Sequence, residues 1–272
     1  MADRREVREI TSPSNALLKV FRRALAEGVT REGWLAVEGP HLLEEALQAV
    51  PRVAVERVLV ARSGARKFSA LLARLPKEAE VTHVSDRLFA RVAQTESPQG
   101  IAVLVERRAD DLDAVLARGD ALLLVACGLQ DPGNLGTMMR SGQALGATAL
   151  LTLEGTVSAF NPKAVRASAG AVFHLPIFQE QKPGRLFPRL RAAGVRIVAA
   201  DRHSPAPVVQ ADLRGSVAIL IGQEGAGLPP EISREASLLL SIPIRAGTDS
   251  LNAATAASVF LYEVARQREF RY

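Results

Sequence analysis

The sequence has one cysteine, Cys127, among its 272 residues. A single cysteine excludes a disulfide within the chain and argues against a metal site built from thiolates. The four histidines are scattered without the spacing of zinc ligands, at His41, His83, His174 and His203. We therefore expect neither a disulfide framework nor a bound metal.

Long apolar runs are also missing. No stretch approaches the roughly 18 to 20 consecutive apolar residues that cross a bilayer. The first ten residues, "MADRREVREI", are charged where a signal peptide is apolar. Hydrophobic residues still make up 48% of the chain, enough for a sizeable core. These features predict a cytoplasmic protein with no membrane partner.

Aromatic residues are scarce, at 4%, which disfavours nucleic-acid recognition on a platform of stacked rings. The charge balance is basic, with 34 Lys and Arg against 29 Asp and Glu, and a net charge of +5 favours a polyanionic partner. On a helix that begins near Ser14, Lys19, Arg22 and Arg23 share one face. This face fits a nucleic-acid contact and a merely solvated surface equally well.

Several common enzyme patterns are absent. Gly222, Gly225 and Gly227 are spaced G-x-x-G-x-G rather than G-x-G-x-x-G, and no G-x-x-x-x-G-K-[ST] occurs, so a familiar nicotinamide or nucleoside-triphosphate site is disfavoured. The same glycines also fit a tight turn with no ligand. Ser250 lacks the G-x-S-x-G context and suitable His and Asp partners, which disfavours a serine hydrolase.

The first half alternates short strands and helices, and we place a first domain at residues 1–105. A charged connector at 106–119, with one or two helical turns, leads to a second domain at 120–272. The first-half strands are predicted at 34–39, 55–61, 80–85 and 100–106, and the helices at 14–26, 41–50, 66–75 and 86–93.

The second half contains nearly continuous aliphatic strands separated by helix-length segments. This pattern predicts an α/β domain with a parallel sheet covered on both faces, in which ligands sit beyond the carboxyl ends of the strands. Its strands are predicted at 121–126, 147–153, 173–178, 195–200, 216–222 and 237–244, with helices at 134–145 and 251–268.

Three loops at predicted strand ends carry polar residues. In the first, Asn134 is predicted to cap a helix, and Arg140 is flanked on its face by small residues, which suits a ligand contact as well as a solvated arginine. The second places Glu224 within the glycine turn, where its charge would repel a phosphate. The third begins a helix of small residues that permits close approach, capped by Ser250 or Asn252.

Taken in order, the loops "DPGNLGTMMRSGQALGA", "LIGQEGAGLPPEI" and "LSIPIRAGTDSLNAATAASVFLYEVARQ" resemble the three motifs of the SpoU (TrmH-type) branch of the SPOUT methyltransferases. These enzymes transfer a methyl group from S-adenosylmethionine to a ribose 2′-hydroxyl in RNA. The first half resembles the L30e-like substrate-binding domain of the ribosomal-RNA members, in "SPSNALLKVFRRA", "WLAVEGPHLLEEAL" and "TESPQGIAVL".

The resemblance implies a trefoil knot in the second half and a homodimer formed through the C-terminal domain, with the active site at its interface. It implies that S-adenosylmethionine is bound by backbone at Gly222, Ile242 and Leu251. The polar residues of the implied site are Asn134, Arg140, Glu224, Ser250 and Asn252. Arg140 is the implied catalytic arginine, and Glu224 is expected to brace Asn134 or the third loop near the cationic cofactor.

These features predict a 2′-O-methyltransferase that acts on ribosomal RNA, with 23S rRNA favoured by the appended first domain. A drug-resistance methyltransferase for ribosomal RNA has the same plan. The alternatives are a tRNA 2′-O-methyltransferase and a non-catalytic RNA-binding protein on the same scaffold. A nucleotide-dependent oxidoreductase is disfavoured by the missing glycine pattern.

Overall fold

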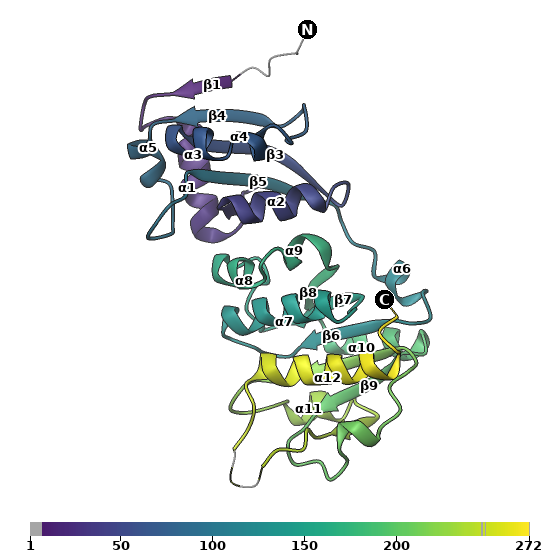
Figure 1. The fold of residues 1–272 in the computed structure, drawn as a ribbon. Coiled ribbons are helices and arrows are strands. Elements are labelled where there is room, and N and C mark those ends of the chain that lie inside the picture. Colours follow the sequence, from purple (N-terminus) through teal and green to yellow (C-terminus); the bar gives the residue numbers. More distant parts are fainter. Residues whose placement is uncertain (1–6, 246, 248, 272) are drawn as a thin grey trace. The chain divides into compact units, whose positions relative to one another are not determined.

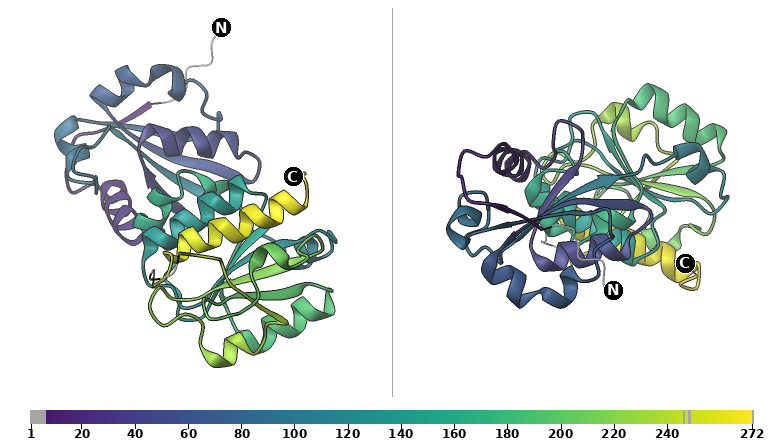
Figure 2. Two further views of the ribbon diagram at one scale, coloured as in Figure 1. Left: turned by 60° about the horizontal axis from the view of Figure 1, so that its bottom comes forward. Right: turned by 90° about the horizontal axis from the view of Figure 1, so that it is seen from above.

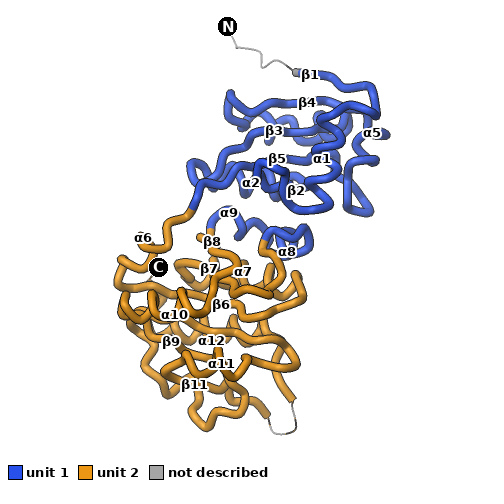
Figure 3. The backbone as a smooth tube through the Cα atoms, turned by 180° about the vertical axis from the view of Figure 1, so that it is seen from behind, with its two compact units in different colours: residues 1–109, 160–174 blue, residues 110–159, 175–272 orange. Residues whose placement is uncertain are grey.

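The computed structural model describes residues 7–245, 247 and 249–271. The chain forms two compact units, coloured separately in Figure 3. Unit 1 contains Met1–Ala109 and Phe160–His174, and unit 2 contains Asp110–Ala159 and Leu175–Tyr272. The predicted division at 1–105, 106–119 and 120–272 stays a prediction. The sequence predictions that fall on residues 1–6, 246 and 248 lie outside the described residues.

Unit 1 is built on a mixed five-stranded sheet in the order β1-β4-β3-β5-β2 (Figure 1). The pairs β1/β4 and β3/β4 are parallel, and β5 runs antiparallel to both β2 and β3. The strands of unit 1 are β1 Val7–Ile10, β2 Leu35–Glu38, β3 Val53–Ala61, β4 Glu80–Val84 and β5 Ile101–Arg107. The helices of unit 1 are α1 Ala16–Glu27, α2 Pro40–Gln48, α3 Arg62–Lys67, α4 Ser69–Leu72, α5 Asp86–Ala90, α8 Pro162–Ala167 and α9 Ala171–His174.

Helices α1 and α5 cover one face of this sheet. Asn15 begins α1 by accepting a hydrogen bond from the Leu17 amide, and Ser85 begins α5 in the same way from Leu88. Phe21 of α1 and Phe89 of α5 are buried in a cluster with apolar side chains of the strands. Because the apolar face of each helix packs against the sheet, its opposite face lies in solvent. On α1 this exposed face carries the basic residues.

Unit 2 is built on a six-stranded parallel sheet in the order β11-β9-β10-β6-β7-β8. Its strands are β6 Leu122–Ala126, β7 Ala149–Leu153, β8 Ile177–Gln181, β9 Arg196–Ala200, β10 Val217–Ile221 and β11 Leu238–Leu240. Its helices are α6 Leu112–Leu116, α7 Pro132–Ala144, α10 Pro183–Ala192, α11 Pro230–Ser233, α12 Ala253–Gln267 and the 3₁₀ turn η1 Val208–Gln210.

Both faces of the parallel sheet are covered. Alternate strand residues such as Leu123 and Leu220 pack in one cluster with Phe187 of α10 and Ile232 of α11. The remaining strand residues point to the other face, because side chains alternate along a strand. That face is covered by α7 and α12, which lie side by side in Figures 1 and 2. This arrangement confirms the predicted α/β class and the parallel sheet.

The structure corrects several sequence predictions. The strand predicted at 173–178 begins only at Ile177, because Ala171–His174 forms the short helix α9. The strand predicted at 237–244 covers only Leu238–Leu240. The helix predicted at 66–75 is split into α3 and α4 at Phe68. Strand β1 had no counterpart in the sequence prediction.

None of the helices formed by the described residues is both long and apolar enough to cross a membrane. Within residues 7–245, 247 and 249–271, no group of three or more His, Cys, Asp or Glu residues is placed to hold a metal ion.

Candidate active site

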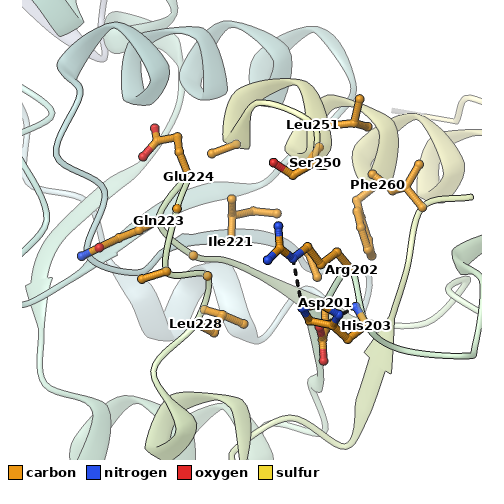
Figure 4. Close-up of a pocket in the computed structure, with 18 of the residues that line it drawn as sticks. Asp201, Arg202, His203, Ile221, Gln223, Glu224, Leu228, Ser250, Leu251 and Phe260 are labelled. Atoms are coloured by element: carbon orange, nitrogen blue, oxygen red, sulfur yellow. Dashed lines mark hydrogen bonds between the residues drawn. The ribbon is translucent and has the colours of Figure 1, made fainter. Parts of the chain in front are cut away.

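A cavity of about 270 Å³ lies at the carboxyl edge of the parallel sheet in unit 2. Its lining includes the last residues of three neighbouring strands, Ala200 of β9, Ile221 of β10 and Leu240 of β11. The start of α12 contributes Ala253, and Phe260 closes the cavity from the same helix (Figure 4). This is the position at which open parallel sheets bind ligands.

The cavity gathers five of the residues predicted from the sequence. Gly222, Ile242 and Leu251, the predicted cofactor contacts, all line it. Glu224 and Ser250 line it as well, from the loops after β10 and before α12. Two segments almost thirty residues apart therefore meet at one site, as the predicted motifs require.

The loop after β10 folds into a tight turn in which Gln223 and Gly227 exchange two backbone hydrogen bonds of 3.0 Å. Gly227 has a φ of +69°, a conformation that glycine adopts without strain. A Cβ at Gly222 would lie only 2.3 Å from the Gly227 carbonyl carbon. The glycines thus serve the turn itself, and the turn holds Glu224 at its exposed tip.

A chain of side-chain hydrogen bonds joins the three predicted motifs. Asn252 caps α12, because its Oδ1 accepts from the Ala254 and Thr255 amides at 2.9 and 3.2 Å. Its Nδ2 is therefore free to donate, and it donates to Oδ1 of Asn134 at 2.9 Å. Nδ2 of Asn134 in turn donates to Oε1 of Glu224.

The direction of this chain is set by the backbone. The two amides at the start of α12 can only donate, which orients the Asn252 amide, and Asn252 then orients Asn134. The last position must accept a hydrogen bond, and the Glu224 carboxylate does so. This contact is the one that the sequence analysis expected of Glu224, which reaches across 90 residues to the first motif.

Asn134 itself differs from its prediction in one respect. Helix α7 begins two residues earlier than expected, with Pro132 in its first turn and Asp131 as the N-cap that accepts from the Gly133 amide. Asn134 is therefore not a cap. Its side chain is left for the contacts with Glu224 and Asn252.

Arg140 lies on α7 but does not line the cavity. Its side chain is exposed, and the structure gives its guanidinium no hydrogen-bond or ion-pair partner among the described residues. Leu135, Met138 and Met139 form the buried side of the same helix. The structure thus separates Arg140 from the seven other predicted site residues, which line the cavity or join the hydrogen-bonded chain.

Helices α7 and α12 pack closely through small side chains. Ser258 Oγ lies 2.7 Å from Ser141 Oγ, and Ala254 and Ala257 are buried. Some of the small residues at the start of α12 therefore pack against α7, and others line the cavity. Ala253 and Ala256 line the cavity, whereas their neighbours pack within the unit.

The loop after β9 brings three ionisable residues to the cavity that were not predicted from the sequence, Asp201, Arg202 and His203. Arg202, in the loop after β9, carries its guanidinium into the cavity (Figure 4). The loop has no distinctive motif, so the only available signal was its place after a predicted strand of the same sheet.

Cys127 follows β6, and its thiol is buried. Burial raises the pKa of the thiol to about 12, because the thiolate would lose its hydration. It does not line the cavity. Cys127 is thus part of the core and has no role as a nucleophile.

A second hollow, of about 170 Å³, lies between α1 and α5 in unit 1. We call it the α1–α5 hollow, lined by Pro13, Leu18, Lys19, Arg22, Leu88, Arg91 and Val92. None of these lining residues is acidic, and among the described residues the three cations have no ion-pair partner. Arg23, by contrast, is bound to Glu27 at 2.8 Å.

Given the resemblance of the three motifs to those of methyltransferases, Glu224→Gln is expected to weaken both cofactor binding and methyl transfer by about two- to tenfold. Glutamine keeps the shape of the side chain but loses the charge that strengthens the bond from Asn134. Calorimetric titration with S-adenosylmethionine and initial rates of methyl transfer measure the two effects. Glu231→Gln removes an exposed acid on α11 and serves as the control. Wild-type binding and rate in Glu224→Gln would show that the charge is irrelevant.

The fold and the site together define a class of protein. Unit 2 is an α/β domain that builds a ligand cavity at the carboxyl edge of a parallel sheet, from glycine-rich and small-residue segments linked by Asn134, Glu224 and Asn252. Residues 121–262 match the model of the SpoU rRNA Methylase family. The chain belongs to this family of methyltransferases. Residues 28–103 match the MRM3-like substrate binding domain.

Similar proteins support the family over nearly the whole chain. The 23S rRNA (guanosine(2553)-2′-O)-methyltransferase of Bacillus subtilis is 31% identical to this chain. The match covers 95% of this chain and 99% of that protein. The 23S rRNA (uridine(2479)-2′-O)-methyltransferase of Streptomyces viridochromogenes is 35% identical, and the match covers 74% of this chain and 72% of that protein.

Among solved structures, the SpoU methyltransferase AviRb from Streptomyces viridochromogenes, in complex with its cofactor AdoMet, superposes with a TM-score of 0.82. It is 31% identical, and the match covers 94% of this chain and 98% of AviRb. The predicted family is therefore confirmed.

Proposed function

We propose that this protein uses S-adenosylmethionine to methylate a ribose 2′-hydroxyl in ribosomal RNA, with 23S rRNA as the favoured target. The observation that carries the proposal is the hydrogen-bonded chain from Glu224 through Asn134 and Asn252 to α12, which joins the three motifs beside one cavity. Two relatives that match over both halves of the chain are named for 23S rRNA, which supports the ribosomal target over tRNA.

The cavity suits the cofactor chemically. Ile221, Leu240 and Phe260 give it apolar walls for an adenine ring, and Leu228 adds to them. Glu224 supplies a negative charge, which is unfavourable for a phosphate but favourable for a sulfonium. The bound cofactor supplies an electrophilic methyl group on that sulfonium.

The remaining chemistry falls to the protein's own side chains. A ribose hydroxyl is a poor nucleophile, so the site must orient it and stabilise the charge that develops on its oxygen. We assign this task to Arg140, which binds the adjacent RNA phosphate and the incipient alkoxide. Its guanidinium stays protonated, so the hydroxyl proton passes to a phosphate oxygen or to water.

Labelled S-adenosylmethionine and total RNA provide the test. We expect label in large-subunit ribosomal RNA, at a ribose that resists alkaline cleavage of its 3′ phosphodiester. Label in tRNA alone would favour the tRNA alternative. No transfer to ribosomal RNA, its precursors or tRNA would support a protein that binds RNA without modifying it.

We also propose that the protein is a homodimer and that its partner completes the site. The support is the place of Arg140, which is exposed on α7 and outside the cavity of its own chain. A second copy that faces α7 would carry its arginine to the reacting hydroxyl. Light scattering behind a sizing column is expected to give twice the 29.1 kDa chain mass, and a monomer at working concentration would contradict this.

The trefoil knot and the cytoplasmic location remain proposals as well. The family resemblance supports the knot, and an experimental structure whose chain runs from β10 to α12 without threading would contradict it. The proposed ribosomal RNA target supports the location, and recovery of the protein in a membrane or secreted fraction would contradict it.

The α1–α5 hollow is the proposed RNA contact of unit 1. Replacing Lys19, Arg22 and Arg91 by Gln is expected to weaken RNA binding about tenfold or more and to lower the slope of log affinity against log salt by about 0.7 to 0.9 per contact. Filter binding with a ribosomal RNA fragment at several salt concentrations measures both quantities.

The matched control removes the same net charge from ion-paired arginines of unit 1. Arg57, Arg62 and Arg74 are bound to Glu80, Glu9 and Glu44. Their replacement by Gln is expected to leave RNA affinity nearly unchanged. Equal losses in the two triple variants would show that only net charge matters, and would remove the hollow from the RNA interface.

A further inference from the structure

The loop after β9 places a permanent cation in the cavity. Four ionisable side chains line it, at Asp201, Arg202, His203 and Glu224. Of these, only Arg202 carries a positive charge at every relevant pH. Figure 4 shows Arg202 and Glu224 extending from different loops around Ile221. The loop after β9 thus contributes Asp201 and Arg202 to the cavity, and the turn after β10 contributes a second acid, Glu224.

Arg202 is held in place but is not neutralised. Its Nε donates to Nε2 of His203 at 3.0 Å, and its Nη1 donates to the Asp249 carbonyl at 3.3 Å. Asp201 turns its carboxylate to the backbone amide of His203, at 2.9 Å. Among the described residues no acidic side chain lies within ion-pair distance of Arg202, and the structure gives its Nη2 no acceptor. One end of the guanidinium thus remains available to a ligand.

An arginine in the cavity needs a reason, because the proposed cofactor carries a positive sulfonium. S-adenosylmethionine also has a positive α-ammonium, and its one anionic group is the α-carboxylate of the methionine part. A carboxylate matches the planar fork of a guanidinium, and a charge-assisted bond to it is stronger than a neutral one. The opposite charges of the amino-acid part thus correspond to Glu224 and Arg202.

We propose that Arg202 binds the α-carboxylate of the methionine part of S-adenosylmethionine and so positions the cofactor in the cavity. This assignment rests on the proposed function. Arg202 is a positioning residue, because it acts on the end of the cofactor remote from the transferred methyl group. His203 supports it by accepting from Nε, which requires that Nε2 of His203 is unprotonated in this arrangement.

The test compares two ligands that differ only in the carboxylate. Full-length wild type, Arg202→Gln and Arg202→Lys are titrated calorimetrically with S-adenosylmethionine and with decarboxylated S-adenosylmethionine. We expect Arg202→Gln to bind S-adenosylmethionine about tenfold more weakly, and Arg202→Lys to recover part of the loss. Affinity for the decarboxylated ligand should be unchanged or higher, because that ligand is purely cationic and loses a like charge nearby.

Arg214→Gln is the matched control, since it removes an exposed arginine of unit 2 that is paired with Asp212 outside the cavity. It should bind both ligands as wild type does. Thermal unfolding of each variant without ligand shows whether the fold is intact. Rates are not needed for this test.

Three outcomes would overturn the inference. Equal losses for both ligands in Arg202→Gln would mean that Arg202 shapes the cavity without contacting the carboxylate. Unchanged cofactor binding with weaker RNA binding would place Arg202 against an RNA phosphate. If wild type binds neither ligand, the proposed cofactor itself is wrong, whereas either of the first two outcomes leaves the proposed function intact.

Discussion

Arg140→Ala is expected to lower the rate of methyl transfer by about a hundredfold or more while leaving the affinity for S-adenosylmethionine unchanged. In the role proposed for Arg140, its guanidinium stabilises the charge that develops on the ribose oxygen, and donors of this kind contribute about 10²- to 10³-fold to rates. The cofactor affinity is preserved because Arg140 does not line the cavity. Single-turnover rates and calorimetric titration measure the two quantities separately.

The fold of this variant should be intact, because the Arg140 side chain is exposed and has no partner within the described residues. Arg140→Lys keeps the charge but loses the planar fork, and an intermediate rate is expected. A rate in Arg140→Ala above about a tenth of wild type, a loss under about 1.4 kcal/mol, would remove Arg140 from the chemistry.

Gly222→Ala is expected to abolish cofactor binding by forcing the turn after β10 to open. The new methyl group would lie 2.3 Å from the Gly227 carbonyl carbon and 2.5 Å from the Leu228 amide nitrogen, both in the backbone. Since backbone atoms cannot rotate away, the turn must shift, and a shift near 1 Å costs about a hundredfold at a positioned site. We expect a further loss of about 1 to 3 kcal/mol in the free energy of unfolding.

Alanine variants of two other glycines distinguish the effect of crowding at Gly222 from the effect of replacing a glycine by alanine. Gly225 lies in the same turn with open space around its Cβ position, so Gly225→Ala should change the free energy of unfolding by no more than about 0.5 kcal/mol. Gly184 of α10 has open space and lies outside the cavity, so Gly184→Ala should leave both stability and cofactor binding intact. Normal binding by Gly222→Ala would contradict the role given to the turn.

Arg140→Ala and Gly222→Ala together also test the proposed homodimer. Mixed dimers of Arg140→Ala and Gly222→Ala contain one intact cavity, and the intact arginine belongs to the other chain. If the partner supplies the arginine, random mixing after dissociation should restore about a quarter of wild-type activity. If each chain used its own arginine, mixing would restore nothing.

The sequence predicted most of the elements, because their signals are local. The strands of unit 2 are runs of aliphatic residues such as 121–126, and the observed strands fall largely within them. The cap on α12 was predicted as Ser250 or Asn252, and Asn252 fulfils it. The elements that were misplaced are short. Strand β11 and helix α9 depend on their tertiary surroundings more than on propensity.

The site was harder to predict where a residue's role depends on distant partners. Asn134 has the local context of a cap, but Asp131 and Pro132 begin the helix, and Asn134 bonds to residues 90 and 118 positions away. Arg202 has no local signal at all, since its position in the cavity follows from the parallel alignment of β9 with β10. The family resemblance identified the motif residues but was silent on this loop.

The burial of Cys127 has a practical consequence for spectroscopy. Because burial raises the pKa of the thiol to about 12, Cys127 is protonated at pH 8, and maleimide dyes and spin labels should leave the folded wild-type protein unmodified. A cysteine introduced at an exposed position, such as Thr137→Cys on α7, would then be the one reactive thiol of each chain. Distances between two such labels in a dimer would follow the approach of the two α7 helices directly, without any change to the buried core.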